Sequence, residues 1–337
     1  MTTFGMYVEN LHPGEDDLTV RVAEHREQIE LARDVGLTSL VFGHHLLTDP
    51  IQMIAPLSHI ASVIDISGDM LLCTGVLLLP LLNPVLLAEE LASIDWLSGG
   101  RLVVGVGLGY RPEEFEAAGV EVNQRVGRFN EALDVMMAMW SSDGRWSTDG
   151  KWFSYHDLPG GLRPKQRPHP LLWVAADVDN AVRRAARWDG AWYINPRAAL
   201  STLQRQLPIY EEALAEHGHQ RPAIFPIRRE AFLAKTDQEA KSMAVRYLTK
   251  QLELYKGWGQ YEVTPGSDGP SKLTEENVPD TYLVGSPERV ADLVATYVEE
   301  LGVNHFVLRM QWPGTPHAEV MKSIEMVGER LVGAFGG

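Results

Sequence analysis

The amino-acid sequence predicts an α/β protein folded as a (β/α)8 TIM barrel, with insertions at the face formed by the C-terminal ends of the strands. The chain has 337 residues, within the range of about 200 to over 400 residues for such barrels. Short β-type runs alternate with amphipathic stretches along the whole chain, which favours a parallel barrel over an antiparallel sandwich. One run, residues 102–106, is almost wholly apolar, as expected for a strand covered on both faces.

The candidate strands are eight apolar or β-branched runs, at residues 4–8, 39–42, 70–79, 102–106, 172–175, 191–194, 224–234 and 304–308. The candidate helices carry apolar residues at helical spacing, at residues 22–35, 54–64, 181–188, 200–217, 239–255, 288–301 and 319–332. A further helix follows the run 70–79 and has the clearest ends. Asn83 stands at its cap, Pro84 at its first position, and Gly99 and Gly100 beyond its end.

Two segments interrupt the alternation and are predicted to be insertions in a single domain that spans residues 1–337. Residues 141–161 are rich in turn formers and predict a small hairpin. Residues 257–279 are long, polar and rich in glycine and proline, which predicts a lid over the site. No internal repeat, low-complexity tract or domain linker divides the sequence.

The bulk properties exclude several classes of partner. The formal net charge of -15 argues against nucleic acid or an anionic membrane, because both repel an acidic surface. The single cysteine, Cys73, lies in an apolar stretch and is expected to pack in the core. No signal-peptide pattern is visible, and Pro80 and Pro84 interrupt the most apolar segment, so we expect a cytoplasmic protein.

In a parallel barrel the site forms at the C-terminal ends of the strands, and the fourth candidate strand ends in alternating glycines. Gly105, Gly107 and Gly109 would let a flat or anionic ligand approach the backbone, because no Cβ stands in the way. A dinucleotide fingerprint would need the spacing G-x-G-x-x-G opening into a helix. Here the third glycine comes too early and Arg111 and Pro112 follow, so that interpretation is disfavoured.

Two adjacent histidines, His44 and His45, follow the second candidate strand. Neighbouring side chains point in different directions, and no carboxylate or cysteine lies at a familiar ligand spacing, so no metal site is predicted. A histidine at this end of a barrel can act as an acid or base near neutral pH. A structural role for either histidine is the alternative.

After the fifth candidate strand the sequence opens a helix whose N-terminus could hold a phosphate on its free N–H groups. Asp177 and Asp179 stand at this place, and capping of the helix is the alternative role for either of them. Because a carboxylate repels a phosphate, we expect these aspartates to turn away from it.

A set of segments follows in register along the first half of the chain, at residues 74–80, 83–84, 88–89, 97–102, 105–110 and 114–115. Together they resemble the bacterial luciferase-like superfamily of flavin- or F420-dependent oxidoreductases. Further matches are Arg125, Glu131, Trp140 and residues 184–190, 285–288 and 302–309.

The resemblance implies a barrel that binds FMN or F420 at its C-terminal mouth. The flavin ring would lie against the end of the third strand, where many members have a non-prolyl cis peptide, here between Gly75 and Val76. The cofactor-binding residues implied are Thr74, Gly75, Val76, Gly107, Leu108 and Gly109, with Ala176, Asp177 and Asn180 around the phosphate.

By the same resemblance His44 is the candidate acid or base beside the flavin. His45, Tyr110, Met310 and Trp312 are candidates for the substrate pocket, with ordinary packing as the alternative for Tyr110 and Trp312. Many F420-using relatives have an Asp-His pair where this chain has Gly43 before its histidines, which favours FMN.

The leading hypothesis is therefore a monooxygenase that uses O2 and reduced FMN, supplied by a separate reductase, to oxidise a small organic substrate. An F420-dependent reductase or dehydrogenase that transfers hydride is the main alternative, and a non-catalytic flavin-binding subunit is another. A metal-dependent barrel hydrolase is disfavoured, since the strand ends supply no ligand cluster. The resemblance also implies a homodimer.

Overall fold

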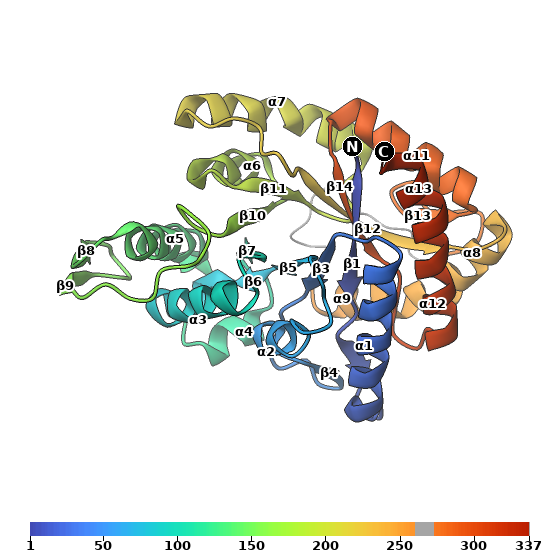
Figure 1. The fold of residues 1–337 in the computed structure, drawn as a ribbon, viewed down its shortest axis with the longest axis horizontal. Coiled ribbons are helices and arrows are strands. Elements are labelled where there is room, and N and C mark those ends of the chain that lie inside the picture. Colours follow the sequence, from blue (N-terminus) through green and yellow to red (C-terminus); the bar gives the residue numbers. More distant parts are fainter. Residues whose placement is uncertain (260–272, 337) are drawn as a thin grey trace.

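Parallel strands form a closed barrel in the computed structural model, which describes residues 1–259 and 273–336. Within these ranges the barrel has eight strands in the order β1-β3-β5-β7-β10-β11-β12-β14, and β14 pairs with β1 (Figure 1). Their bounds are Thr3–Val8, Ser39–Phe42, Leu71–Thr74, Leu102–Gly107, Leu171–Ala176, Ala191–Ile194, Pro226–Leu233 and His305–Arg309. The predicted (β/α)8 TIM barrel is confirmed.

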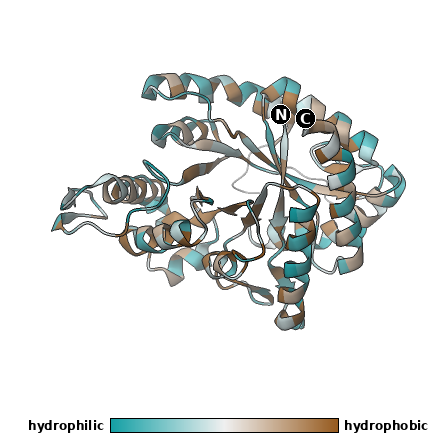
Figure 2. Cartoon of the chain, viewed as in Figure 1, coloured by the Kyte–Doolittle hydropathy of each residue, from teal (hydrophilic) through white to brown (hydrophobic). Residues whose placement is uncertain are grey.

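Helices surround the barrel, and Figure 2 shows that they carry much of the hydrophilic sequence. They are α1 (Leu18–Asp34), α2 (Pro56–Ala61), α3 (Pro84–Leu97), α4 (Pro112–Ala117), α5 (Arg125–Ser141), α6 (Asp179–Ala185), α7 (Leu200–His217), α8 (Asp237–Met243), α9 (Thr249–Gly257), α11 (Pro287–Leu301), α12 (His317–Met326) and α13 (Gly333–Phe335). The predicted start of α3 is confirmed, since the Asn83 side chain accepts hydrogen bonds from the N–H groups of Val85 and Leu86. In the described ranges no helix has the length and apolar character needed to cross a membrane.

Several short elements lie outside the barrel alternation. Strands β8 (Trp146–Thr148) and β9 (Tyr155–Leu158) pair antiparallel, as predicted for the insertion at 141–161. The sequence did not predict three short strands, β2 (Leu11–Pro13), β4 (Ile51–Met53) and β13 (Leu283–Gly285). It also did not predict helix α5. Of the predicted lid at 257–279, residues 260–272 lie outside the described residues.

The predicted strand at 70–79 is divided in two. Strand β5 ends at Thr74, and β6 (Leu77–Leu78) resumes the pairing with β7 after a cis peptide between Gly75 and Val76. The cis bond expected from the resemblance is therefore present. It lies at the C-terminal end of the barrel, where the site was expected.

The interior of the barrel is filled by side chains from alternate strand positions, because successive residues of a strand point to opposite faces. This inner cluster consists of Tyr7, Val41, Cys73, Val103, Trp173, Ala191, Tyr193 and Val307. Burial raises the pKa of the Cys73 thiol. The expected packing role of this cysteine is confirmed.

Three buried histidines form a row between α1, β2 and α2. The His25 ring centroid lies 5.0 Å from those of both His12 and His59, and its Nδ1 lies 3.3 Å from His59 Nε2. Burial lowers the pKa of His12 and of His59 to about 4, and it also holds the pKa of His25 well below its ordinary value. The row is therefore uncharged at neutral pH.

We predict that acidification from pH 6.5 to about pH 4 destabilises the fold through this row. Because the folded pKa values are the lower ones, the unfolded chain binds more protons in this window, so the free energy of unfolding falls as the pH falls. Urea unfolding at a series of pH values measures the slope. The His25→Gln variant should show a shallower slope than the wild type, and equal slopes would contradict the prediction.

Candidate active site

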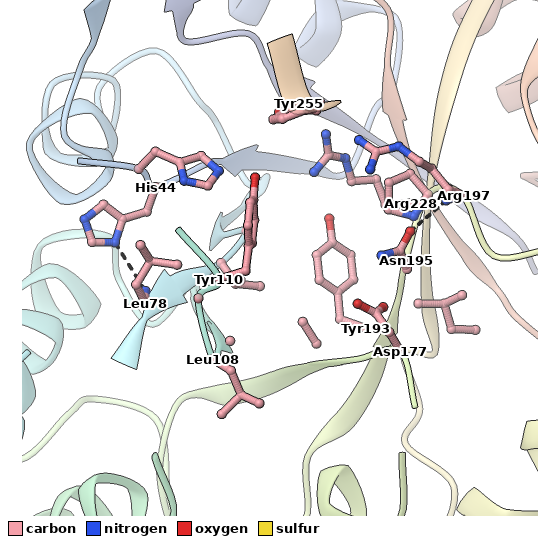
Figure 3. A pocket seen from close by; sticks show the side chains of 18 of the residues that line it. His44, Leu78, Leu108, Tyr110, Asp177, Tyr193, Asn195, Arg197, Arg228 and Tyr255 are labelled. Atoms are coloured by element: carbon pink, nitrogen blue, oxygen red, sulfur yellow. Dashed lines mark hydrogen bonds between the residues drawn. The ribbon is translucent and has the colours of Figure 1, made fainter. Parts of the chain in front are cut away.

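A cavity of about 280 Å³ opens at the C-terminal ends of the barrel strands. Figure 3 shows side chains from several strand ends pointing into it. The predicted site residues that line it are His44, His45, Gly75, Val76, Gly107, Leu108, Gly109, Tyr110 and Asp177. The structure thus brings together most of the residues proposed from four separate segments of the sequence.

Thr74 joins two strands below this cavity. Its hydroxyl donates to the Gly105 carbonyl and accepts from the Gly105 N–H, each at 2.8 Å, and its side chain is fully buried. Thr74 therefore positions the Gly75–Val76 peptide against β7 and is not itself among the lining residues.

The glycines at and after the end of β7 also have a packing role that the sequence did not reveal. A Cβ on Gly105 would lie 1.8 Å from the Thr74 carbonyl oxygen, and one on Gly107 would lie 2.5 Å from Val76 Cγ2. Gly109 has a φ of 74°, which favours glycine. Glycine is thus needed for close packing of β7 on the preceding segment and for the turn, whereas room for a ligand stays a prediction for Gly107 and Gly109, which line the cavity.

His44 is held as a neutral imidazole. Its Nδ1 accepts a hydrogen bond from the Leu78 N–H at 3.3 Å (Figure 3), so the ring proton resides on Nε2. Burial, with a smaller effect from the charge of His45, lowers the pKa of His44 to about 4. Near neutral pH the side chain can donate a hydrogen bond, but it is a weak base.

His45 forms a pair with a buried carboxylate that the sequence did not reveal. Its Nδ1 lies 2.9 Å from Glu114 Oε1, which also accepts from the Leu46 N–H at 2.9 Å and lies 3.5 Å from Arg111 Nη1. Burial raises the pKa of the Glu114 carboxyl, but the His45 hydrogen bond and these other partners outweigh it and hold the pKa below its ordinary value. The pair therefore keeps an ionised carboxylate against the imidazole.

Asp177 does not turn away from the cavity, contrary to our expectation. Its side chain is half-buried among the lining residues, beside Asn195 and Arg197 (Figure 3). Burial raises the pKa of its carboxyl, while a hydrogen bond from Asn195 and the charge of Arg197 act against this. An aspartate in this position disfavours a phosphate beside it.

The other two residues expected around the phosphate lie outside the cavity. Ala176 is buried, and its carbonyl accepts a hydrogen bond from Trp192 Nε1 at 2.9 Å. Asn180 is exposed in a surface groove, where Asp179 and Arg205 form an ion pair at 2.7 Å. The N-cap of α6 is Val178, which supplies no side-chain hydrogen bond, so neither aspartate caps this helix.

Met310 and Trp312 are likewise not among the lining residues. Met310 is buried in the core between strands and helices, because it lies on the outward side of the chain leaving β14. Trp312 is fully buried, and its Nε1 donates to Glu230 at 2.7 Å. Both residues pack in the interior, which corrects the expectation of a substrate-pocket role.

Comparison with known proteins identifies the family. The profile described as luciferase-like monooxygenase matches residues 2–305. The chain belongs to this family. It is 25% identical over 268 residues to the FMNH(2)-dependent dimethylsulfone monooxygenase of Pseudomonas putida, covering 72% of each chain.

Two solved structures share the fold over almost the full length. The luciferase-like chain matches the monooxygenase RslO1 from Streptomyces bottropensis with a TM-score of 0.84 and 21% identity, covering 99% of both chains. It matches an F420-dependent secondary alcohol dehydrogenase, in complex with an F420-acetone adduct, with a TM-score of 0.78 and 18% identity, covering 98% of both. Its relatives are thus oxidoreductases that include FMN-dependent and F420-dependent proteins.

The cavity of this luciferase-like chain also contains basic residues that sequence reasoning missed. Arg125, Arg197 and Arg228 line it, and Arg125 Nη1 donates to the Gly109 carbonyl at 3.1 Å. Arg125 could have been identified, since it was one of the matches to the family. Within the described ranges no group of three or more His, Cys, Asp or Glu side chains is placed to hold a metal ion.

We predict that Glu114→Ala lowers the free energy of unfolding by about 1–3 kcal/mol, because it leaves the donors on His45 and Leu46 without their acceptor and removes the carboxylate beside Arg111. Urea unfolding measures the loss. Glu116→Ala, on the exposed face of the same helix, is the matched control and should change stability by no more than about 0.5 kcal/mol. Equal effects of the two substitutions would show that the buried pair does not stabilise the fold.

Proposed function

We propose that this chain is a flavin-dependent monooxygenase that uses reduced FMN and O2 to oxidise a small organic substrate. The observation that carries the proposal is the convergence of the Gly75–Val76 peptide, the Gly107–Gly109 turn and both histidines around one cavity. The relative named above is FMNH(2)-dependent, and in this proposal a separate reductase would supply the reduced FMN to this chain.

The cavity lining suits FMN. Val76 and Leu108 offer apolar surface to a flat ring, and the buried hydroxyls of Tyr110 and Tyr193 have no hydrogen-bond partner among the described residues. Arg125, beside the Gly109 turn, is the residue best suited to the phosphate, because Asp177 disfavours an anion on the neighbouring strand. Bound reduced FMN would supply the electrons that activate O2.

FMN is favoured over F420 by the presence of Gly43 before the histidines. A Cβ at this position would lie 2.0 Å from the Tyr7 hydroxyl. The aspartate that many F420-using relatives have before the histidine would therefore collide with Tyr7. The packing thus explains why this chain has glycine here, and the absence of that aspartate before the histidines is what favours FMN.

The two histidines would have different roles. His44, neutral and fixed by Leu78, would donate a hydrogen bond from Nε2. His45 would transfer the proton, because Glu114 Oε1, 2.9 Å from its Nδ1, orients the ring. The His45 ring lies against Tyr110, with centroids 5.7 Å apart, so it faces the cavity that the reactants would occupy. This assignment replaces the expectation that His44 is the acid or base.

Cofactor choice is tested by anaerobic titration of the chain with reduced FMN and with reduced F420. We expect FMN to bind at least about tenfold tighter than F420, and Arg125→Gln to weaken FMN binding about tenfold by removing a charge-assisted hydrogen bond. Riboflavin, which lacks the phosphate, should bind equally to wild type and variant. Tighter binding of F420 would overturn the FMN assignment in favour of a hydride-transferring reductase.

Proton transfer is tested by the rate at which O2 reoxidises bound reduced FMN. The His45→Ala variant should slow this reaction by about 10²-fold, since general acid catalysis contributes about 10²–10⁴-fold, and should flatten its pH profile. Glu114→Gln should cause a smaller loss of rate, because the amide oxygen can still accept a hydrogen bond from the His45 ring. His156→Ala, on the exposed hairpin, is the control. An unchanged profile in His45→Ala, with a flattened one in His44→Ala, would return the role to His44.

A further inference from the structure

Arg228, one of the arginines in the cavity, makes no hydrogen bond to a carboxylate of the described residues. It is largely buried, and within residues 1–259 and 273–336 the carboxylate oxygen that pairs with it is Glu230 Oε1 at 3.8 Å, beyond hydrogen-bond distance. Glu230 is also held by Trp312 and Gln251, and lies 4.0 Å from Arg309. Glu230 therefore offsets the Arg228 charge only from a distance and makes no hydrogen bond to its guanidinium, and a buried charge without a hydrogen-bonded partner is costly.

Surrounding groups hold Arg228 in place without neutralising it. Its guanidinium carbon lies 3.8 Å from the centroid of the Tyr7 ring, a cation–π contact. The neighbouring Arg309 is already paired with Glu9, through Nε at 2.7 Å, and donates to the Tyr255 hydroxyl at 3.0 Å. The Glu9–Arg309 ion pair thus supports Arg228 without pairing with it. The Arg228 charge therefore remains available to a ligand in the cavity.

A second hydrogen-bond donor, the Tyr193 hydroxyl, lies on the same side of the cavity as Arg228. The Tyr193 hydroxyl points toward the arginines in Figure 3, and it has no partner among the described residues. The Arg228 Nε likewise has none. Two buried donors from neighbouring strands β11 and β12 therefore point into one part of the cavity.

This part of the cavity is separate from the end proposed for the FMN phosphate. In the strand order, β14 lies directly across the barrel from β7. Arg228 on β12 stacks on Tyr7 of β1, and these two strands flank β14. Arg125 lies at the other side, against the Gly109 turn that follows β7. The two arginines therefore belong to different sides of the barrel mouth.

We propose that Arg228 and the Tyr193 hydroxyl form a subsite for an anionic oxygen group of the substrate, so that the substrate is a small organic acid carrying a carboxylate or sulfonate. The planar fork of arginine matches both groups and can donate two parallel hydrogen bonds to either. The assignment to substrate rests on the proposed function; the anion site itself does not, since it can be measured without cofactor or turnover.

The experiment measures equilibrium binding of three probes, hexanoate, hexanesulfonate and 1-hexanol, to the full chain by calorimetry, with and without saturating FMN. We expect at least one anion to bind about tenfold or more tighter than hexanol, and Arg228→Gln to abolish that preference. Arg228→Lys should retain part of it, because the charge remains while the fork is lost. Arg183→Gln, which removes an exposed charge on α6, should bind all probes as the wild type does.

Tyr193→Phe provides a second variant that removes one hydroxyl and conserves the shape of the side chain. It should weaken binding of the anion about threefold to tenfold and leave hexanol unaffected. Equal affinity of wild type and Arg228→Gln for both anions would overturn the subsite. Loss of anion binding on addition of FMN would instead assign Arg228 to the cofactor and overturn the substrate role. A cofactor titration that favoured F420 would refute the proposed monooxygenase without changing these probe affinities.

Discussion

The close contact between the end of β5 and strand β7 is the constraint on which the site depends. The Thr74 hydroxyl bonds both backbone groups of Gly105, and no side chain beyond glycine fits at positions 105 and 107. This contact places the Gly75–Val76 peptide at the centre of the barrel mouth, with the Gly109 turn beside it. One wall of the cavity is thus formed by backbone from two adjacent strands, which is a rigid surface.

Charge is distributed unevenly between the surface and the site. The chain carries a net charge of -15, yet three arginines line the cavity. The buried Glu9–Arg309 pair, whose partners lie 300 positions apart in sequence, joins β14 to the chain end of β1 and supports this basic side. A cavity of opposite sign to its surroundings attracts anionic ligands locally, although the whole surface repels large polyanions.

Much of the fold could be predicted because burial and hydrophobic periodicity are local properties of a sequence. Strands at 39–42 and 191–194 and the helix at 200–217 coincide with the observed bounds. The three-residue strand β13 is too short to show a period, and it forms only because β12 lies beside it. Helix α5 was missed although Phe129, Leu133, Met136 and Trp140 recur at helical spacing, so the signal was available.

By itself, the sequence determined the barrel, the order of its strands and the strand ends that carry polar residues and glycines. The tertiary structure alone decided which of these groups meet. His45 pairs with Glu114, which is 69 positions away, while Met310 and Trp312 pack into the interior and Arg228 lies in the cavity. The reason is physical: the direction of a side chain and its long-range partners depend on how the strands tilt and close around the barrel, and no local pattern encodes that closure.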